Sequence, residues 1–454
     1  MHCLQFLVND ILFSVCEYLV LFINRTKYFF VFKQQLKLNK LPVFLFCSFY
    51  CFLFYVFRRI IMKFQISTSV FVNRFMPVAQ TINSNNKDSQ EIYSNALIKV
   101  NKDSIVFIGA NPTTRIVIDL PVTDDIKVVE TGNILINASL LSNFLRTVNA
   151  DGMLFELRDD QSLIIATDNG AYKLPTLSDQ ASNYPNWDMT SVDNSFEVDS
   201  ASLYKLIKHT TYASAKTDSA DEVLTGIQMN FNKDGIICYG TDKFIFSKAQ
   251  TDIQSEGLTD EVSVVVPSDV LSKLSTIIFK TKLLELQTTY NLLKILNKDA
   301  HMEYDIRLLN NNYPLANKVI EKVLGSTSFS FNVNMRDTYE ALKRVYVLLK
   351  NSEKVSYARI QVTKDNEVYL SANVSKEKLA TSNFQGQIAD DDFTFSFNPE
   401  YLMNILKQSY SSQDNITFTF GKDGLSPMSI QCDSSQDLDK QVQLVAAIRE
   451  FGKN

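Results

Sequence analysis

Six segments with the apolar spacing of an amphipathic helix recur along the chain at nearly constant intervals. They begin near Ser69, Ala138, Ser200, Ser268, Met335 and Pro399, so successive starts lie 62 to 69 residues apart. A fixed interval of this kind indicates one structural unit that is copied along the chain. Each helix carries a single apolar stripe, so it must pack on a larger surface. The sequence therefore predicts six similar units in series.

Start signals support these six helices. Four residues can cap the helix that follows, namely Asn137, Ser268, Asn334 and Asn398. Pro399 suits a first helical position, and Pro77 is expected to kink the first helix.

Between the helices lie short runs of alternating or β-branched residues bounded by turn residues, which predict antiparallel hairpins. The clearest runs are 105–108, 115–120, 162–166, 226–231, 262–266, 358–362, 367–372 and 416–420. Plain linkers around 184–186 and 310–325 divide the six units into three pairs. We therefore predict an α+β fold with three similar domains, each containing a doubled motif of one helix and several antiparallel strands. Their expected boundaries are 62–190, 191–325 and 326–454.

Residues 1–61 differ in composition from the rest of the chain. They are crowded with Phe, Leu, Tyr, Lys and Asn, which AT-rich codons encode. The apolar run 42–57 is shorter than the ~20 residues of a membrane-spanning helix, and no signal-peptide cleavage site follows it. We interpret this stretch as translated upstream DNA ahead of a start at Met62. The alternative is a membrane-associated extension.

Cysteine usage predicts a reducing compartment. Residues 1–61 hold four of the six cysteines, and the remainder keeps only Cys238 and Cys432. Two cysteines in so long a chain leave no disulfide framework, so we expect a cytoplasmic protein.

Charge separates by structural element. The formal net charge of the chain is −5, and residues 62–454 alone carry 38 basic and 48 acidic side chains. The six predicted helices nevertheless hold ten basic and only four acidic residues. For one helix, lysines that serve solubility would explain the bias. Six helices on one concave wall would present a cationic surface to DNA phosphates. The candidate DNA-binding residues are Arg74, Arg146, Lys205, Lys208, His209, Lys273, Lys343, Arg344 and Lys407.

Catalytic motifs are not found in the sequence. The three histidines, His2, His209 and His301, lack metal-ligand spacing, and neither a glycine-rich phosphate loop nor a nucleophile elbow occurs. The acidic run 390–392 is more typical of a solvated turn than of a metal site. We expect a non-catalytic protein without metal or cofactor.

Several short motifs resemble those of one family in order and spacing. They are Met62-Lys63-Phe64-Gln65-Ile66, Ala96-Leu97-Ile98-Lys99-Val100, Tyr184-Pro185-Asn186, Leu224-Thr225-Gly226-Ile227, Thr241-Asp242 and Tyr313-Pro314. Over residues 62–454 the chain resembles the bacterial DNA polymerase III beta subunit, the replication sliding clamp.

The resemblance implies a homodimeric ring whose helices face a central hole around duplex DNA, bound without regard to sequence. Such a processivity factor tethers the replicative DNA polymerase, and its other expected partners are the clamp loader and proteins with a clamp-binding motif. Weak phosphate contacts would permit sliding. The alternative function is a membrane-anchored β-rich binding protein that uses residues 1–61 as its anchor.

The resemblance also implies a pocket for short peptide motifs between the second and third domains. Carried over to this sequence, its residues are Leu224, Thr241, Lys243, Phe246, Pro314, Lys318, Val319, Asn398, Tyr401, Met428, Leu444, Val445, Ala446, Ala447, Ile448 and Arg449. Two stretches depart from the family pattern. Family members commonly continue the Thr-Asp pair with Gly-His-Arg-Leu where this chain has Lys243-Phe244-Ile245-Phe246, and Ala446-Ala447 replaces a step that ends in proline. The peptide preference is therefore expected to differ.

Overall fold

The computed structural model describes residues 60–82, 91–187, 191–216, 219–253, 255–258, 260–274, 281–309, 312–314, 316–350, 357–372, 375–388, 392–411, 414–431 and 440–449. The interpretation of residues 1–61 falls outside this part of the chain, except that β1 (Ile60–Ser67) begins two residues before Met62. Most of the acidic run 390–392 also lies outside it. No helix among the described residues combines the length and the apolar character needed to cross a bilayer.

All six predicted helices form, and they begin at or within one residue of the expected positions. They are α4 (Thr68–Ile82), α5 (Ala138–Leu145), α6 (Ser200–Thr210), α7 (Ser268–Leu274), α9 (Met335–Lys350) and α10 (Pro399–Ser409). The side chains of Asn137, Asn334 and Asn398 accept hydrogen bonds from the backbone N–H groups of Leu140, Asp337 and Glu400, at 2.9, 3.2 and 2.9 Å. These three caps are confirmed.

One start signal differs from the prediction, and one cap was not predicted. Ser268 is the first residue of α7, and its hydroxyl oxygen accepts a hydrogen bond from the Ser214 hydroxyl at 2.6 Å. The cap of α6 is Asp199, whose carboxylate accepts from the Ser202 N–H at 2.8 Å. The helix α4 continues through Pro77, and the Thr81 hydroxyl donates to the Pro77 carbonyl at 3.0 Å.

The linker predicted at 310–325 contains a helix, α8 (Ala316–Leu324), which was not predicted. The side chains of Ile320, Val323 and Leu324 pack against the neighbouring sheet. This contact stabilises the helix although Asn and Pro residues precede it. Short 3-10 helices occur at η1 (Glu91–Ser94), η2 (Ser178–Asn183), η3 (Thr211–Ala213) and η4 (Glu222–Thr225).

The strands of the described residues form four antiparallel sheets, and each predicted run falls within a strand to one residue. The five-stranded sheet has the order β5 (Ile126–Glu130), β1, β7 (Gly152–Arg158), β8 (Ser162–Thr167) and β9 (Gly170–Pro175). The four-stranded sheet has the order β21 (Ser375–Leu379), β20 (Val368–Ala372), β19 (Ala358–Thr363) and β23 (Asp392–Phe397).

Each of the two larger sheets joins two of the three domains, which are called the first, second and third units from here on. The eight-stranded sheet has the order β10 (Asn194–Asp199), β15 (Leu283–Thr288), β16 (Leu292–Asn297), β17 (Met302–Arg307), β4 (Thr114–Pro121), β3 (Ser104–Ala110), β2 (Asn95–Val100) and β6 (Gly132–Asn137). The nine-stranded sheet has the order β14 (Val262–Pro267), β11 (Gly226–Asn232), β12 (Gly235–Thr241), β13 (Ile245–Thr251), β26 (Lys440–Val445), β25 (Met428–Gln431), β24 (Asn415–Gly421), β18 (Thr327–Asn334) and β22 (Thr381–Gly386).

The doubled motif is the same in each unit. One strand leads into a helix, and a meander of three strands follows, as in β1-α4-β2-β3-β4 and β6-α5-β7-β8-β9. The first strand of each half joins the sheet formed by the meander of the other half, which locks the halves together. This confirms the predicted α+β fold of three similar clamp units.

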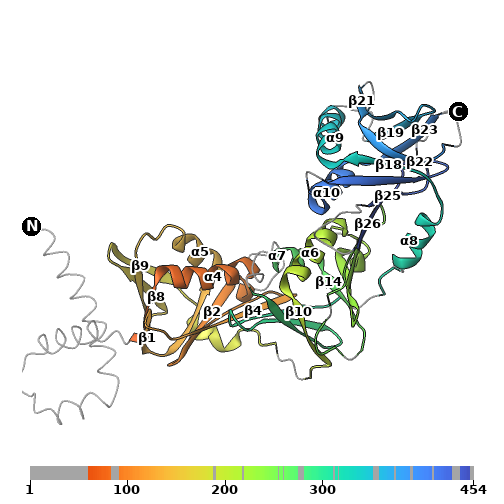
Figure 1. Cartoon of the computed structure of the whole chain (residues 1–454). Coiled ribbons are helices and arrows are strands. Elements are labelled where there is room, and N and C mark those ends of the chain that lie inside the picture. Colours follow the sequence, from red (N-terminus) through yellow and green to blue (C-terminus); the bar gives the residue numbers. More distant parts are fainter. Residues whose placement is uncertain are drawn as a thin grey trace, which may run out of the picture.

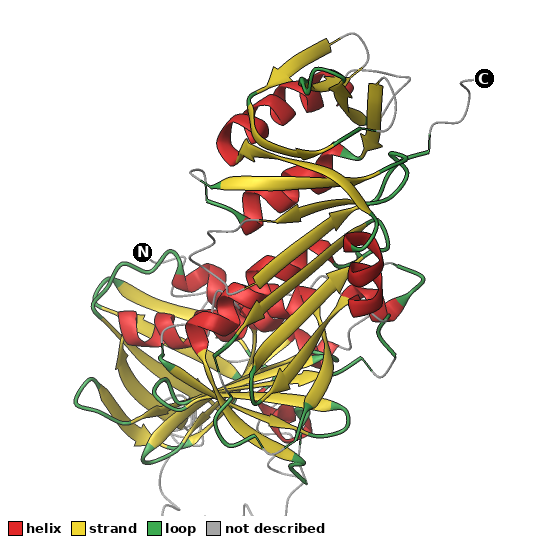
Figure 2. Cartoon of the chain, turned by 45° about the vertical axis from the view of Figure 1, so that its right-hand side comes forward, coloured by secondary structure: helices red, strands yellow, loops and turns green. Residues whose placement is uncertain are grey.

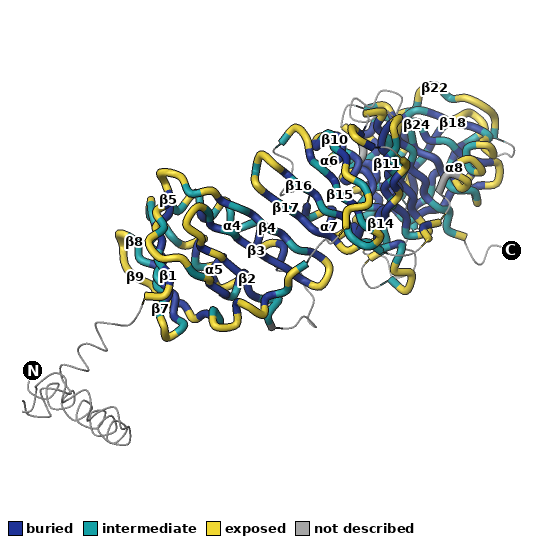
Figure 3. Tube along the Cα trace, turned by 90° about the horizontal axis from the view of Figure 1, so that it is seen from below, coloured by how far each residue is buried: buried dark blue, intermediate teal, exposed yellow. Residues whose placement is uncertain are grey.

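The units follow one another along an arc (Figure 1). The helices α4, α5, α6, α7, α9 and α10 lie on the concave side, the sheets lie outside them, and α8 lies on the convex side. Turning the molecule shows that the strand layer continues from one unit into the next (Figure 2). The described strands are buried along much of their length beneath the helices (Figure 3). This placement follows from the single apolar stripe on each helix.

A cluster of charged side chains bridges the first and second units where β4 meets β17. The Arg115 guanidinium donates to Asp305 at 3.0 Å and to Glu303 at 3.3 Å, and Lys294 lies 2.7 Å from Glu303. The linker takes part, because the Trp187 carbonyl also accepts from Arg115 at 3.5 Å. Burial, and next the repulsion by Glu303, raise the pKa of Asp305 to about 6.

Asp305→Asn should change the pH dependence of stability. Because the folded-state pKa of Asp305 lies above its ordinary value, the folded chain holds a proton that the unfolded chain has lost. That stabilisation is complete below the unfolded pKa and is lost as pH rises through about 6. The unfolding free energy of the native chain should thus fall relative to Asp305→Asn between roughly pH 4 and 6, by up to about 1.4 kcal/mol per pH unit. Urea unfolding across this range measures the difference. Parallel pH curves for the two proteins would contradict the assignment, and Asp124→Asn in an exposed turn is the control.

Candidate nucleic-acid interface and peptide pocket

The nine predicted DNA-binding residues all belong to helices of the concave side or to their ends. Arg74 lies on α4, Arg146 at the end of α5, Lys273 on α7 and Lys407 on α10. Lys205, Lys208 and His209 lie on α6, while Lys343 and Arg344 lie on α9. The positions are therefore gathered on one side of the arc, as Figure 1 lets the reader follow.

Several of these cations are already engaged within the chain. Arg74 donates to the Ala300 carbonyl of the second unit at 2.7 Å. Lys343 lies 3.2 Å from Glu340, and Arg344 pairs with Glu377. Lys273 lies 3.9 Å from Asp269 on the same helix. Pairing lowers the positive potential that these residues offer to a phosphate.

Three of the nine predicted residues are exposed cations that make no ion pair with any residue that the structure describes. They are Arg146, Lys208 and Lys407, so each unit contributes one of them. Each lies on a helix end or an exposed helix face that points away from its sheet. These three residues are the strongest candidates for phosphate contacts.

The prediction that His209 faces DNA is corrected by its burial. Its side chain is 1 % exposed, and its carbonyl accepts a hydrogen bond from the buried Ser247 hydroxyl at 2.6 Å. The outward residues of α6 are Ala201, Tyr204, Lys205 and Lys208, which form one narrow stripe at helical spacing. His209 follows Lys208 directly and therefore turns toward the sheet.

Several of the predicted peptide-pocket residues lie around the junction of β13 and β26. In that pairing Phe246 lies opposite Leu444, and Ile245 lies opposite Val445, while Met428 of β25 also pairs with Val445. Phe246 and Leu444 are buried in one apolar cluster with Tyr313 and Ile320. Leu224 lies in η4 nearby and is 3 % exposed. Segments from the second and third units therefore meet here.

The turn that departs from the family pattern has an unusual backbone. Asp242 accepts hydrogen bonds from the N–H groups of Phe244 and Ile245, both at 2.8 Å, and the Thr241 hydroxyl donates to the Ile245 carbonyl at 2.7 Å. Lys243 has φ of 83°, the left-handed region where glycine is favoured, and its ammonium pairs with Asp221. The turn keeps a glycine-like conformation with a lysine in place.

The third unit contributes further residues at this junction. Burial, and next the carboxylate of Asp242, raise the pKa of Tyr401 to about 12. The Ala446 N–H donates to the Phe244 carbonyl at 2.8 Å, and the Ile448 N–H donates to the Ser396 carbonyl at 2.7 Å. Ala446, Ala447 and Ile448 are half-buried and Arg449 is exposed. Asn398 is the cap of α10, which explains its position without a ligand.

Helix α8 and the residues before it also border this cluster. Pro314 and Lys318 are exposed, and Val319 is 46 % exposed. The residue of α8 that enters the apolar cluster is Ile320, which sequence reasoning missed. The spacing of Ile320, Val323 and Leu324 is the signal that could have identified it.

Among the described residues, the five-stranded sheet of the first unit ends in the edge strands β5 and β9, and the four-stranded sheet of the third unit ends in β21 and β23. Of these, β9 and β21 are the last strands of their meanders. Apolar side chains accompany both edges. Tyr172 of β9 is 42 % exposed and packs edge-on against Phe144 of α5, with ring centroids 5.0 Å apart. Val347 and Leu348 near the end of α9 are 59 % and 52 % exposed.

Comparisons with known proteins cover the same three units. Family models of the DNA polymerase III beta subunit match with its N-terminal domain at residues 62–188, its central domain at 197–315 and its C-terminal domain at 327–445. The beta sliding clamp of Bacillus subtilis is 22 % identical over 398 residues, covering 86 % of this chain and all of the relative. That of Streptococcus pneumoniae is 25 % identical over 362 residues, covering 78 % and 92 %.

Solved structures share the fold. The DNA polymerase III beta chain of Streptococcus pneumoniae superposes with a TM-score of 0.77 at 20 % identity, over 86 % of this chain and 100 % of that one. The DNA polymerase sliding clamp from Bacillus subtilis gives a TM-score of 0.75 at 20 % identity with the same coverage. The chain therefore belongs to the DNA polymerase III beta subunit family, the beta sliding clamps, and is a non-catalytic processivity subunit of DNA polymerase.

Proposed function

We propose that two copies of this chain close head to tail into a ring whose helix-lined hole holds duplex DNA. The observation that carries this proposal is that each unit has at least one exposed cation on the concave side without an ion pair to the described residues, namely Arg146, Lys208 and Lys407. In a dimer these cations would surround the duplex with weak, sequence-independent phosphate contacts. Weak contacts suit a protein that must slide.

The pattern of strand pairing supports a specific closure. Each unit has a first and a second half, and each half ends with the third strand of its meander. At both junctions between units, the third strand from the first half of one unit pairs with the third strand from the second half of the next unit: β4 with β17, and β13 with β26. The two strands of this type left over are β21 and β9. Pairing β21 with β9 of a second copy continues the rule and produces two identical junctions related by a two-fold axis.

The three-domain division that we propose follows the expected boundaries of 62–190, 191–325 and 326–454. Each range contains two copies of the helix-and-meander motif. A subunit that acts on chromosomal DNA works in the cytoplasm, in line with the low cysteine content of residues 62–454.

Replacing Arg146, Lys208 and Lys407 together by glutamine should weaken DNA association and reduce its salt dependence. The logarithm of affinity against the logarithm of salt concentration should become shallower by about 0.9 for each phosphate that the variant no longer neutralises. Fluorescence anisotropy with a labelled duplex at several salt concentrations measures this slope. The matched control replaces Lys102, Lys233 and Lys422, one exposed lysine from a strand turn of each unit, by glutamine. An equal change in both triple variants would refute a specific role of the concave side.

The pocket between the second and third units is proposed to bind short peptide motifs of the replicative polymerase, the clamp loader and other partners. Its apolar floor of Phe246, Leu444 and Ile320 and its polar rim at Asp242, Tyr401 and Lys243 fit an extended peptide with apolar anchors. The altered turn at Lys243 and the helix α8 would give this site a peptide preference that differs from that of other family members.

Val319→Asp should weaken binding of a fluorescent clamp-binding peptide by roughly 10-fold, because a charge would be placed on the exposed apolar rim. Fluorescence polarisation measures the affinity. Leu283→Asp, at a similarly exposed aliphatic position of β15, should leave it unchanged. Undiminished binding by Val319→Asp would remove α8 from the peptide site.

A further inference from the structure

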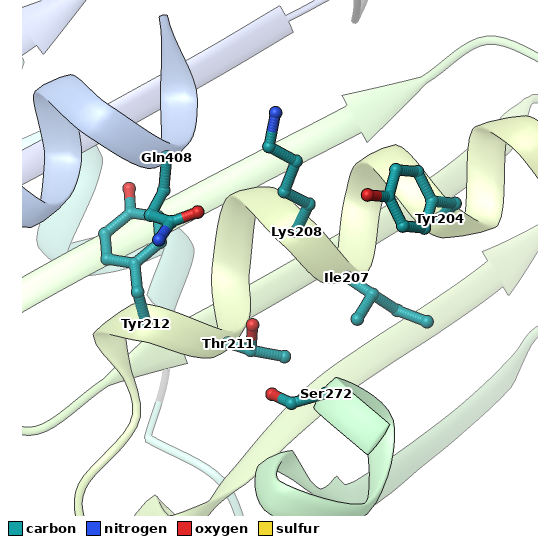
Figure 4. Close-up of a pocket in the computed structure, with 7 residues that line it drawn as sticks. All are labelled: Tyr204, Ile207, Lys208, Thr211, Tyr212, Ser272 and Gln408. Carbon is teal, nitrogen blue, oxygen red and sulfur yellow. The ribbon is translucent and has the colours of Figure 1, made fainter. Parts of the chain in front are cut away.

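A second pocket opens on the concave side where α6, α7 and α10 meet (Figure 4). Its volume is about 370 Å³, and it is lined by Tyr204, Ile207, Lys208, Thr211, Tyr212, Ser272 and Gln408. Tyr204 and Tyr212 lie on either side of Lys208 along the chain, Ser272 comes from α7, and Gln408 comes from α10 of the third unit. None of these lining residues belongs to the proposed peptide site at β13 and β26.

The walls of this pocket are held by the surrounding structure. The end of α6 lies directly against β12, because the Thr210 carbonyl approaches Gly240 so closely that a Cβ there would lie 2.4 Å from the oxygen. The Tyr212 phenol donates to the Ser247 hydroxyl at 3.3 Å, and the Ser272 hydroxyl donates to the Ser268 carbonyl at 2.8 Å. Tyr212 is therefore oriented before any ligand arrives, which lowers the entropy cost of binding.

The lining combines two kinds of chemistry. The two phenol rings offer flat apolar surface, whereas Lys208, Thr211 and Gln408 offer hydrogen-bond donors. None of the seven described lining residues is acidic. A simple phosphate would use the donors and leave the rings unused. A ligand that uses both must carry a flat aromatic group beside an anionic one, which describes a nucleotide.

The state of the DNA follows from the aromatic rings in the lining of the pocket. In a duplex the bases are stacked inside the helix, so their faces cannot reach a ring on the wall. An unpaired base is free to stack on an aromatic side chain, as in proteins that bind single strands. Stacking tolerates every base, and the Gln408 amide can donate to or accept from any base edge.

We propose that this pocket is a subsite for one unpaired nucleotide of single-stranded DNA next to a duplex held in the ring. The base stacks on Tyr204, its phosphate lies at Lys208, and Gln408 reaches the base edge from the third unit. The subsite rests on the proposed function, because it requires the concave side to face DNA. It would hold the clamp at the boundary between duplex and single strand.

The test compares the full-length protein on a blunt duplex and on the same duplex with a single-stranded thymidine tail. Tyr204 is 39 % exposed on the helix surface, so Tyr204→Ala should leave the fold intact. We expect Tyr204→Ala to weaken binding of the tailed DNA by roughly 5- to 100-fold, as for loss of one stacked base, and to leave the blunt duplex unaffected. Tyr204→Phe should retain tail binding, because the ring remains. An aminopurine base in the tail should be quenched by the native protein and by Tyr204→Phe only.

Control variants and competitors distinguish failure of the subsite from failure of the ring proposal. Tyr290→Ala removes an 82 % exposed tyrosine from a strand turn and should affect neither DNA. Equal weakening on blunt and tailed DNA by Tyr204→Ala, or no weakening on either, would overturn the subsite. Displacement of the tail by polyglutamate as efficiently as by a thymidine oligomer would also overturn it, because the pocket would then take acidic peptides. Native protein that binds the tail but not the blunt duplex would contradict the ring proposal, and with it a subsite next to a held duplex, whereas loss of tail discrimination alone overturns only the subsite.

Discussion

Leu348→Asp is expected to convert a dimeric ring into single chains. Leu348 and its neighbour Val347 are more than half exposed near the end of α9, which packs beside the unpaired edge strand β21. In the proposed closure these side chains face Phe144 and Tyr172 of the second copy. Burial of one such aliphatic side chain contributes about 1.5–3 kcal/mol, and a buried carboxylate adds a desolvation cost. The dimer should weaken by roughly 100-fold or more.

Analytical ultracentrifugation over a range of concentrations measures this change. The matched control is Leu425→Asp, which places the same charge at a leucine that is 55 % exposed in the turn between β24 and β25. That variant should remain as dimeric as the native protein. A native protein that stays monomeric at every concentration, or equal dissociation of both variants, would contradict the closure through β21 and β9.

Phe71→Ala should cause the largest loss of stability among single substitutions in the first unit. The Phe71 ring is fully buried on α4, with its centroid 4.6 Å from that of Phe155 in the five-stranded sheet and 5.3 Å from that of Phe107 in the eight-stranded sheet. It therefore holds both sheets to the helix that carries Arg74. Removing a buried phenyl ring costs about 3–5 kcal/mol through reduced burial and the remaining cavity.

Urea unfolding followed by fluorescence gives this cost. Phe71→Leu should lose less stability because it leaves a smaller cavity. Phe244→Ala removes the same ring from a position that is 59 % exposed, and should change stability by no more than about 0.5 kcal/mol. Similar losses for Phe71→Ala and Phe244→Ala would show that the first core does not depend on this helix-to-sheet packing.

The helices and strands could be predicted because their signals are local. Asn137, Asn334 and Asn398 supply cap geometry within one turn, and the apolar stripes repeat at helical spacing. The helix α8 was missed because asparagines and Pro314 precede it and, among its apolar residues whose burial is described, only Ile320 is buried. Its stability comes from packing on a distant sheet, which no local pattern contains.

The pairing of strands across units could not be predicted from the sequence. The edges of β4 and β17 meet although nearly two hundred residues separate Ile118 from its partner Met302. Neither strand has a sequence pattern that specifies its pairing partner. The same limit applies to the site. Arg146 and Lys208 were predicted as cations of one surface, but the pairing of Arg344 with Glu377 on a separate strand was not. The prediction for His209 was wrong for a simpler reason, since the outward stripe of α6 is too narrow to include it.

The ring itself is tested most directly by retention on circular DNA. Native protein loaded onto a nicked circular plasmid should remain bound during gel filtration in high salt and should be released once the plasmid is cut at one site, because only a closed ring is held by topology. Leu348→Asp should be released from both forms. Equal retention of the native protein on circular and linear DNA, or release from both, would contradict a closed ring around the duplex.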